Sequence, residues 1–292
     1  GGVVMPNPRG TAPGCIMEKD GRIAIVLPGP PFEMKHMFQN YAKPYLEDKS
    51  DSVLVSHYVH ILGMGESTVA EKLADMIASQ TNPTLATYAG NSEVQLRITA
   101  KCKKGDDAEA IIAPVEKEVL ERLGSVVYGI GDEGLDIVVS NMLTKANKTL
   151  ALAESCTGGW LCSDFVHNAG CSAFLLESCV CYSNEAKQRR LGIPKEMLEK
   201  YGAVSEEVAA EMAKNVREQS AADYALSTTG IAGPDGGTPE KPVGLVYIGV
   251  ANKAGVKVHK LQLSSDRTRN RMRASINAIN FLRLQMLEDG IK

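Results

Sequence analysis

Strands and helices alternate from residue 134 to the end of the chain, and this order restricts the possible folds more than any other pattern in the sequence. Apolar segments of strand length are separated by segments with the apolar spacing of a helix. The predicted strands lie at 149–153, 179–182, 224–228, 244–251 and 256–263, and the predicted helices at 134–146, from 158, at 184–191, 206–220 and 266–287. This order is typical of an α/β layered domain with functional sites at the strand ends.

The first 46 residues do not show this alternation of strands and helices. Two turn-rich pieces, 6–14 and 27–31, flank a short apolar strand at 23–26, and a helix is predicted at 32–45. One strand and one helix bury too little surface for a core of their own. We therefore expect residues 1–46 to be the end of a larger domain, in a chain that is a fragment or a processed form because it does not begin with Met.

Residues 47–133 predict a small α+β unit. A strand at 52–62, a helix at 67–79, a strand at 93–100 and a helix at 108–123 follow one another. The segment carries 8 basic and 15 acidic residues, a net charge of −7. Such a charge repels nucleic-acid phosphates.

The composition is that of an ordinary globular protein, with 44% hydrophobic and 23% charged residues. No apolar run is long enough to span a bilayer, and because the first residues show no basic region followed by an apolar one, we expect no secretory signal. The seven cysteines are irregularly spaced and include no Cys-x-x-Cys pair. Reduced thiols are therefore expected, with a cytoplasmic location, no metal site and no cofactor.

The first candidate site is Glu154-Ser155-Cys156-Thr157-Gly158-Gly159, between a predicted strand and a predicted helix. The N–H groups at a helix start suit a phosphate or a developing oxyanion, and glycines let a ligand approach the backbone. The alternative is structural: Thr157 serves only as a helix cap and the glycines only fit a tight turn.

The second candidate is Tyr182-Ser183-Asn184-Glu185-Ala186-Lys187. Ser183 or Asn184 can cap the following helix, which leaves Lys187 in its first turn. The positive end of the helix dipole favours a neutral amine there, as a lysine base requires. The alternative is a solvated surface lysine.

Two further pieces complete the set. The glycine-rich loop 228–237 could cradle a phosphate or shape a pocket floor, or it could be a flexible connection. Ser265 or Asp266 can cap the last helix. Arg267 and Arg271 share one face of that helix, where they form either a phosphate-binding fork or a solvated basic face.

In order and spacing these motifs resemble the CinA family. The matching segments are Glu154–Gly159, Tyr182–Lys187, Gly202–Ser205 (Gly-Ala-Val-Ser), the loop 229–237 with Lys241–Gly244, and Asp266-Arg267. The resemblance implies that residues 134–292 form an α/β/α layered domain that deamidates nicotinamide mononucleotide. It also implies a KH-like α+β domain at 47–133, and at 1–46 a remnant of an α/β molybdopterin-binding-like domain. Ser265 stands where many members have Gly.

The family is described as using a serine nucleophile and a lysine base, which fall on Ser155 and Lys187, with Tyr182 as the third polar group. Cys156 is the competing nucleophile, although no histidine accompanies it in the matching motifs. Either Thr157–Gly159 or Arg267 is expected to hold the phosphate. The expected substrate-binding residues are Glu154, Thr157, Gly158, Gly159, Ser183, Thr229, Gly230, Gly233, Asp235 and Arg267.

Two other functions remain open from the sequence. A metal-dependent pyrophosphatase could act through the first segment, whose opening glycine-rich and acidic motifs are missing here. A nucleic-acid-binding module could use the KH-like segment, although Gly63-Met64-Gly65 replaces the usual Gly-x-x-Gly grip. We expect a homodimer that binds a small-molecule substrate, with neither nucleic acid nor membrane as a partner.

Overall fold

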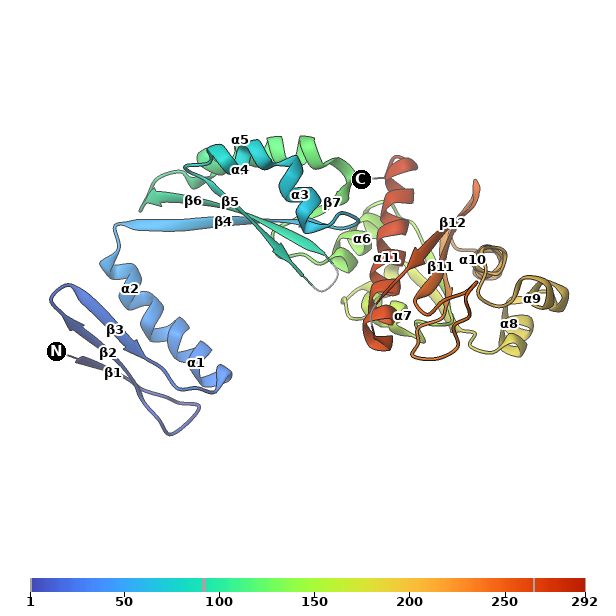
Figure 1. Cartoon of the computed structure of the whole chain (residues 1–292), viewed down its shortest axis with the longest axis horizontal. Helices are drawn as coiled ribbons and strands as arrows, with labels where there is room; N and C mark the ends of the chain where they lie inside the picture. Colours follow the sequence, from blue (N-terminus) through green and yellow to red (C-terminus); the bar gives the residue numbers. More distant parts are fainter. Residues whose placement is uncertain (1, 91–92, 265, 292) are drawn as a thin grey trace. The chain divides into compact units, whose positions relative to one another are not determined.

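The computed structural model describes residues 2–90, 93–264 and 266–291, so the predicted cap Ser265 lies outside the described residues. The chain divides into two compact units (Figure 1). Unit 1 comprises residues 1–57, 75–85 and 98–118, and unit 2 comprises residues 58–74, 86–97 and 119–292. Within the described part of the chain, no helix is both long and apolar enough to cross a membrane.

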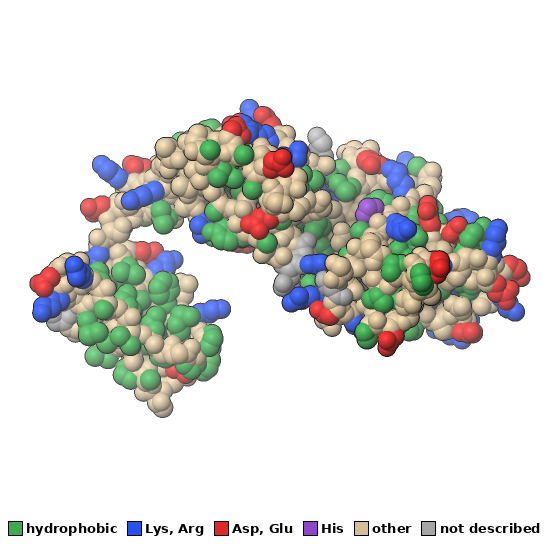
Figure 2. Space-filling view, in the orientation of Figure 1, with side chains coloured by type: hydrophobic (Ala, Val, Ile, Leu, Met, Phe, Trp, Pro, Cys, Tyr) green, Lys and Arg blue, Asp and Glu red, His purple; other side chains and the backbone are tan. Residues whose placement is uncertain are grey.

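The N-terminal part is an antiparallel sheet followed by helical turns. Its elements are β1 (Gly2–Met5), β2 (Gly14–Lys19), β3 (Arg22–Val26), α1 (Pro31–Met37), a π-helical turn (Phe38–Ala42) and α2 (Lys43–Lys49). The sequence predicted only the last strand and the helix. Met5, Ile16, Met37 and Ala42 form a small core, contrary to the expectation of no core. Apolar side chains also remain exposed on this part (Figure 2), among them Val4 at 70%.

The next part is built on a four-stranded sheet of order β5-β6-β4-β7. Its elements are β4 (Ser52–Ile61), α3 (Glu66–Lys72), α4 (Ala74–Ser79), β5 (Thr84–Ala89), β6 (Val94–Lys103), α5 (Ala108–Leu123), a 3₁₀ turn (Gly124–Val126) and β7 (Val127–Ile130). The two predicted strands and the helix at 108–123 are present, and the helix predicted at 67–79 is divided into α3 and α4. Strands β5 and β7 were not predicted.

The C-terminal part contains a five-stranded sheet of order β12-β11-β10-β8-β9. The strands are β8 (Leu150–Glu154), β9 (Leu175–Val180), β10 (Tyr224–Gly230), β11 (Leu245–Asn252) and β12 (Gly255–Gln262). Strand β8 runs parallel to both β9 and β10, whereas β11 and β12 are antiparallel. The predicted α/β fold class is confirmed.

Two hydrophobic cores lie on opposite faces of this sheet. The helices are α6 (Leu135–Lys145), α7 (Trp160–Val166), α8 (Asn184–Leu191), α9 (Lys195–Tyr201), α10 (Glu206–Ser220) and α11 (Arg267–Glu288). Leu150 and Leu152 of β8 belong to the core with α6, α7 and α11, and Ala151 and Ala153 to the core with α8, α9 and α10. Because successive strand residues point to opposite faces, β8 is covered on both sides.

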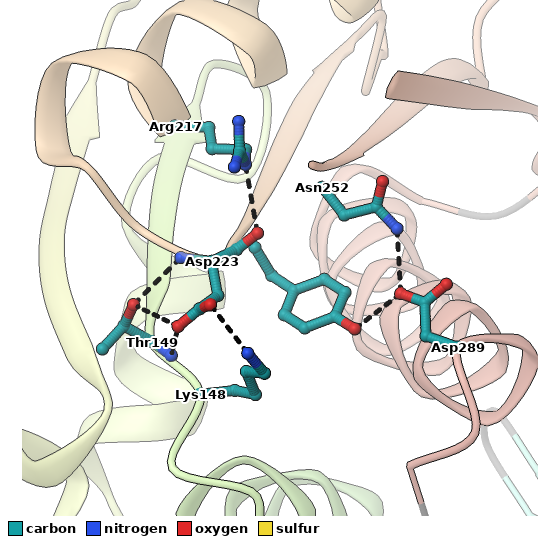
Figure 3. A network of polar contacts seen from close by, with 7 residues as sticks. Lys148, Thr149, Arg217, Asp223, Asn252 and Asp289 are labelled. Carbon is teal, nitrogen blue, oxygen red and sulfur yellow. Dashed lines mark hydrogen bonds and ion pairs between the residues drawn. The ribbon is translucent and has the colours of Figure 1, made fainter. Parts of the chain in front are cut away.

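A polar network ties together the amino ends of β8 and β10 (Figure 3). The Asp223 carboxylate accepts from Lys148 Nζ at 2.9 Å and from the N–H and hydroxyl of Thr149 at 3.0 Å each. Arg217 Nε donates to the carbonyl of Asp223 at 3.1 Å. These bonds help to fix the register that pairs Leu150 with Tyr224. In the same register Glu154, at the carboxyl end of β8, pairs with Thr228 of β10.

Candidate active site

The candidate site lies at the carboxyl ends of three neighbouring parallel strands. Ser155 follows β8, the segment Cys181–Ser183 follows β9, and Thr229 stands near the end of β10. The N–H of Ser155 donates to the carbonyl of Thr228 at 2.9 Å, which anchors the nucleophile turn to β10. This is the edge of an α/β sheet at which ligands bind.

Lys187 reaches Ser155 from helix α8. Its Nζ lies 3.0 Å from Ser155 Oγ, 2.8 Å from the carbonyl oxygen of Cys181 and 3.3 Å from that of Tyr182. Ser183 begins the helix as its N-cap, accepting from the N–H of Ala186 at 3.1 Å. Two backbone carbonyls therefore hold the amine of Lys187, and Ser155 Oγ is its third contact.

Burial makes the neutral form of Lys187 accessible. The residue is 1% exposed, and desolvation lowers the pKa of its amine below the usual 10.5. A neutral amine has two hydrogens and one lone pair. The two carbonyl contacts match the two hydrogens, so the lone pair can accept the hydroxyl proton of Ser155. Such an arrangement can activate a serine without a histidine.

Cys156 is the poorer nucleophile in this setting. Its thiol is 7% exposed, and burial raises its pKa to about 12. Because the thiolate is the reactive form, the helix start does not activate this cysteine. The geometry favours Ser155 over Cys156.

Glu154 occupies the helix start that the sequence assigned to a ligand. Its fully buried carboxylate accepts from the N–H groups of Gly159, Leu161 and Cys162 at 2.8, 3.2 and 2.8 Å. The dipole end of α7 is therefore already neutralised by a carboxylate. A phosphate placed there would meet a negative charge instead of free donors.

The other residues of this turn also have structural contacts. Gly159, and not Thr157, is the N-cap of α7, with φ +92°. The hydroxyl of Thr157 lies 2.7 Å from that of Thr228. Gly158 has φ +61°, a conformation in which a side chain is strained.

Two N–H groups of the turn adjoin Ser155, those of Cys156 and Thr157, and both contact the thiol of Cys156. Across 2–90, 93–264 and 266–291, no backbone carbonyl accepts from either group. The N–H of the residue after a nucleophile is a recurrent oxyanion donor. These two groups are the best candidates for an oxyanion hole here.

A pocket of about 260 Å³ contains the pair. Its lining residues are Ser155, Cys156, Tyr182, Lys187, Ala203, Val204, Thr229, Gly230, Ile231, Ala232, Gly233, Asp235, Gly236 and Arg267. Eight of the expected site residues thus meet in one cavity. Glu154, Thr157, Gly158, Gly159 and Ser183 do not line it.

Arg267 and Tyr182 form one rim of the pocket. Arg267 Nη1 donates to the carbonyl of Gly233 at 2.8 Å, and Nη2 lies 3.4 Å from the Tyr182 hydroxyl. Tyr182 is 62% exposed, and it contacts Lys187 through its carbonyl. Asp266 is confirmed as the cap of α11, since its carboxylate accepts from the N–H of Arg269 at 3.0 Å.

The sequence did not assign roles to several residues that shape the pocket. Thr229 Oγ1 donates to the carbonyl of Ala203 at 2.7 Å, which explains how the Gly202–Ser205 motif joins the site. Asn270 Nδ2 donates to the carbonyl of Ala232 at 3.1 Å. Every residue has a backbone carbonyl, so a sequence does not show which carbonyls accept such hydrogen bonds. The Gly202–Ser205 motif itself could be recognised in the sequence.

Among the described residues, no group of three or more His, Cys, Asp or Glu side chains could hold a metal ion. The fold and the site define an α/β protein with a serine–lysine pair at the ends of parallel strands.

This chain belongs to the CinA family. Residues 132–286 match the family described as CinA C-terminal domain, and residues 56–129 match the Damage-inducible protein CinA KH domain. A CinA-like protein of Kosmotoga olearia is 50% identical over 287 residues, which cover 98% of this chain and 70% of the relative.

Two solved structures resemble the C-terminal part. The competence/damage inducible protein CihA from Agrobacterium tumefaciens is 36% identical, with a TM-score of 0.51, and the match covers 51% of this chain and 92% of that one. A CinA superfamily protein from Klebsiella pneumoniae is 29% identical with the same TM-score, covering 53% and 96%. These names describe a family and state no reaction.

Proposed function

We propose that this chain deamidates nicotinamide mononucleotide, releasing ammonia and leaving nicotinate mononucleotide. The observation that carries the proposal is the contact between Lys187 Nζ and Ser155 Oγ, 3.0 Å apart in a pocket at the sheet edge. A nucleophile next to a desolvated base is the arrangement that acyl transfer from an amide requires. The resemblance of the motifs supplies the substrate class.

The reaction proceeds in two acyl-transfer steps. Ser155 Oγ attacks the carboxamide carbon while its proton passes to Lys187 Nζ. The tetrahedral intermediate collapses, the C–N bond breaks, and Lys187 returns the proton to the departing ammonia. Water then attacks the acyl-enzyme, Lys187 takes its proton and returns it to Ser155, and the carboxylate leaves.

Backbone groups stabilise the charge that develops on the carboxamide oxygen. The N–H groups of Cys156 and Thr157 lie in the turn of the nucleophile, and no backbone carbonyl among the described residues accepts from them. Removing one such donor from a hydrolase costs about 100- to 1000-fold in kcat. The Cys156 N–H adjoins Ser155 in sequence and is the leading donor.

Arg267 is the proposed handle for the 5′-phosphate. Of the two expected phosphate sites, the helix start at Thr157–Gly159 faces the Glu154 carboxylate, whereas Arg267 lines the pocket. A guanidinium binds phosphate through two parallel hydrogen bonds. Such a contact is worth about 1.5–3 kcal/mol.

An ammonia-release assay tests the proposal with nicotinamide mononucleotide, nicotinamide riboside and NAD as alternative substrates. We expect the mononucleotide to react best and the riboside at least roughly tenfold less efficiently in kcat/KM. Arg267→Met should remove most of that preference by raising KM for the mononucleotide. Absence of ammonia from all three substrates, with folded protein, would refute the proposed reaction.

We propose no nucleic-acid partner for the KH-like part. Residues 47–133 carry a net charge of −7, and the loop between β4 and α3 contains Gly63-Met64-Gly65 in place of a four-residue grip. Titration of the protein with a labelled single-stranded RNA at low salt should give no binding. Salt-dependent binding of the RNA would contradict the proposal that this segment has no nucleic-acid partner.

A further inference from the structure

The first turns of α11 hold both loops that border the pocket. Arg267 and Asn270 donate to carbonyl groups of the glycine-rich loop 228–237 at 2.8 and 3.1 Å. Arg271 donates to the carbonyl of Thr157 from Nη2 at 2.7 Å and from Nε at 3.3 Å. Since positions three and four apart share one face of a helix, the three side chains act on the same side of α11.

Arg271 fits closely against the nucleophile turn. Its guanidinium lies over the ring of Trp160, 5.4 Å from the centroid. A methyl group added at Gly158 would lie 3.3 Å from Nη2, so the turn and the guanidinium have little space between them. Arg271 does not line the pocket. Its contacts are therefore with the turn.

The turn has other contacts as well, among them the Thr157 hydroxyl, 2.7 Å from that of Thr228, and the Thr157 carbonyl, which also accepts from the N–H of Trp160 at 3.4 Å. The N–H of Ser155 bonds to Thr228 at the end of β10, and the Glu154 carboxylate bonds to Gly159 at the start of α7. Arg271 is bonded to the peptide between these points, through the carbonyl of Thr157. A charge-assisted bond there fixes the peptide plane that follows the N–H groups of Cys156 and Thr157.

We propose that Arg271 is a positioning residue for the nucleophile. By holding the Thr157 carbonyl, it keeps Ser155 Oγ beside Lys187 and keeps the N–H groups of Cys156 and Thr157 aligned for the oxyanion. The inference rests on the proposed function as far as serine–lysine hydrolysis is concerned, and it does not depend on which amide is the substrate.

The experiment compares Arg271→Met and Arg271→Lys with a matched control, Arg269→Met. Arg269 stands on the same helix, its side chain is 62% exposed, and its ion pair is with Asp266. We expect Arg271→Met to lower kcat for nicotinamide mononucleotide about 10- to 100-fold, with KM changed less than about threefold. Arg271→Lys should retain more activity, added guanidinium at low concentration should partly restore Arg271→Met, and the control should behave as wild type.

A second readout does not depend on the substrate. A fluorophosphonate reacts with an activated serine: Ser155 Oγ bonds to phosphorus, fluoride leaves, and the hydroxyl proton passes to Lys187. Arg271→Met should be labelled at Ser155 more slowly by a similar factor. If wild type is labelled but does not deamidate nicotinamide mononucleotide, the proposed substrate fails while the role of Arg271 is still measured.

Two results would overturn the inference. In the first, Arg271→Met keeps the wild-type kcat and labelling rate. In the second, activity falls only in proportion to the fraction of unfolded protein, with no rescue by guanidinium, which would make the residue purely structural. Thermal unfolding and circular dichroism of each variant distinguish a displaced Ser155 in a folded protein from unfolding of the protein.

Discussion

In the proposed mechanism Lys187 and Ser155 exchange one proton directly, so the effects of losing them should not be additive. We expect Ser155→Ala and Lys187→Ala each to lower kcat about a thousandfold or more, and the double variant to be little worse than either. The physical reason is that the 3.0 Å contact transfers one proton and needs both partners. Steady-state ammonia release from the three variants measures this.

Cys156→Ala is the matched control for the nucleophile. Because burial raises the pKa of the thiol to about 12, it supplies almost no thiolate at neutral pH. The variant should keep most of the activity. A dead Cys156→Ala together with an active Ser155→Ala would contradict the serine assignment.

The pH dependence of the proposed deamidation should reflect the lowered pKa of Lys187. Only the neutral amine accepts the serine proton, so kcat/KM should rise with pH through a pKa below 10.5, the value of an unburied lysine. Rates measured from about pH 5 to pH 10 locate this inflection. A flat profile in that range would contradict the assignment of Lys187 as the base.

The same shift predicts a pH dependence of stability. Between the lowered pKa and 10.5 the unfolded chain binds more protons at Lys187 than the folded chain does, so the free energy of unfolding rises with pH. The slope from one group is at most about 1.4 kcal/mol per pH unit. In urea unfolding, the free energy of unfolding of the wild type should rise with pH relative to that of Lys187→Met across this window. A constant difference between the two free energies would contradict a desolvated lysine.

The sequence anticipated the neutral lysine but did not identify which of two causes lowers its pKa. The prediction allowed either desolvation or the helix dipole and favoured the dipole, whereas desolvation is the cause that the structure supports. A strand–turn–helix motif shows that a lysine begins a helix, but not that the side chain folds back onto the carbonyls of Cys181 and Tyr182. For the same reason the motif could not show that Glu154 caps α7 itself.

At the scale of elements, long periodic segments were predicted well and short ones were missed. Helices α8 and α10 begin and end where expected, and β8 and β10 lie within a residue or two of the predicted bounds. Strand β9 begins four residues before the predicted 179–182, and α9 was missed. Half of the residues of β9 are only partly buried, so its apolar pattern is weak.

Close packing of α10 against β11 gives a test at this scale. A methyl group at Gly249 would lie 2.5 Å from Ser227 Oγ, 2.7 Å from the carbonyl of Ala209 and 3.0 Å from Ala213 Cβ. Gly249→Ala should therefore lower the free energy of unfolding by about 1–3 kcal/mol, as overpacking does. Gly29→Ala, where a methyl group would meet nothing within 4 Å, is the control. Equal denaturant midpoints for the two variants would contradict the packing argument.

At the scale of the whole molecule, the boundary before the C-terminal domain is less sharp than the sequence suggested. The predicted boundary was between 133 and 134. Within unit 2, buried Arg283 of α11 donates to the carbonyl groups of Ser125 and Val127, at 3.2 Å for Val127. Tyr128 belongs to the same core as α6 and α11. Residues 124–130 thus contribute to the stability of the domain that follows them, which a composition shift does not reveal.

Two fragments separate activity from this contribution. No residue that lines the pocket precedes Ser155, so fragments 124–292 and 132–292 should both deamidate nicotinamide mononucleotide with kcat within about threefold of the full chain. The shorter fragment loses the acceptors of Arg283 and the ring of Tyr128 from the core. We expect it to melt roughly 2–8 °C lower than the longer one, as 1–2 kcal/mol implies for a domain of this size. Calorimetry and the ammonia assay on the same samples measure both quantities. Loss of turnover in a well-folded 132–292 fragment would show that the preceding residues take part in catalysis, and equal melting temperatures would show that they do not stabilise the domain.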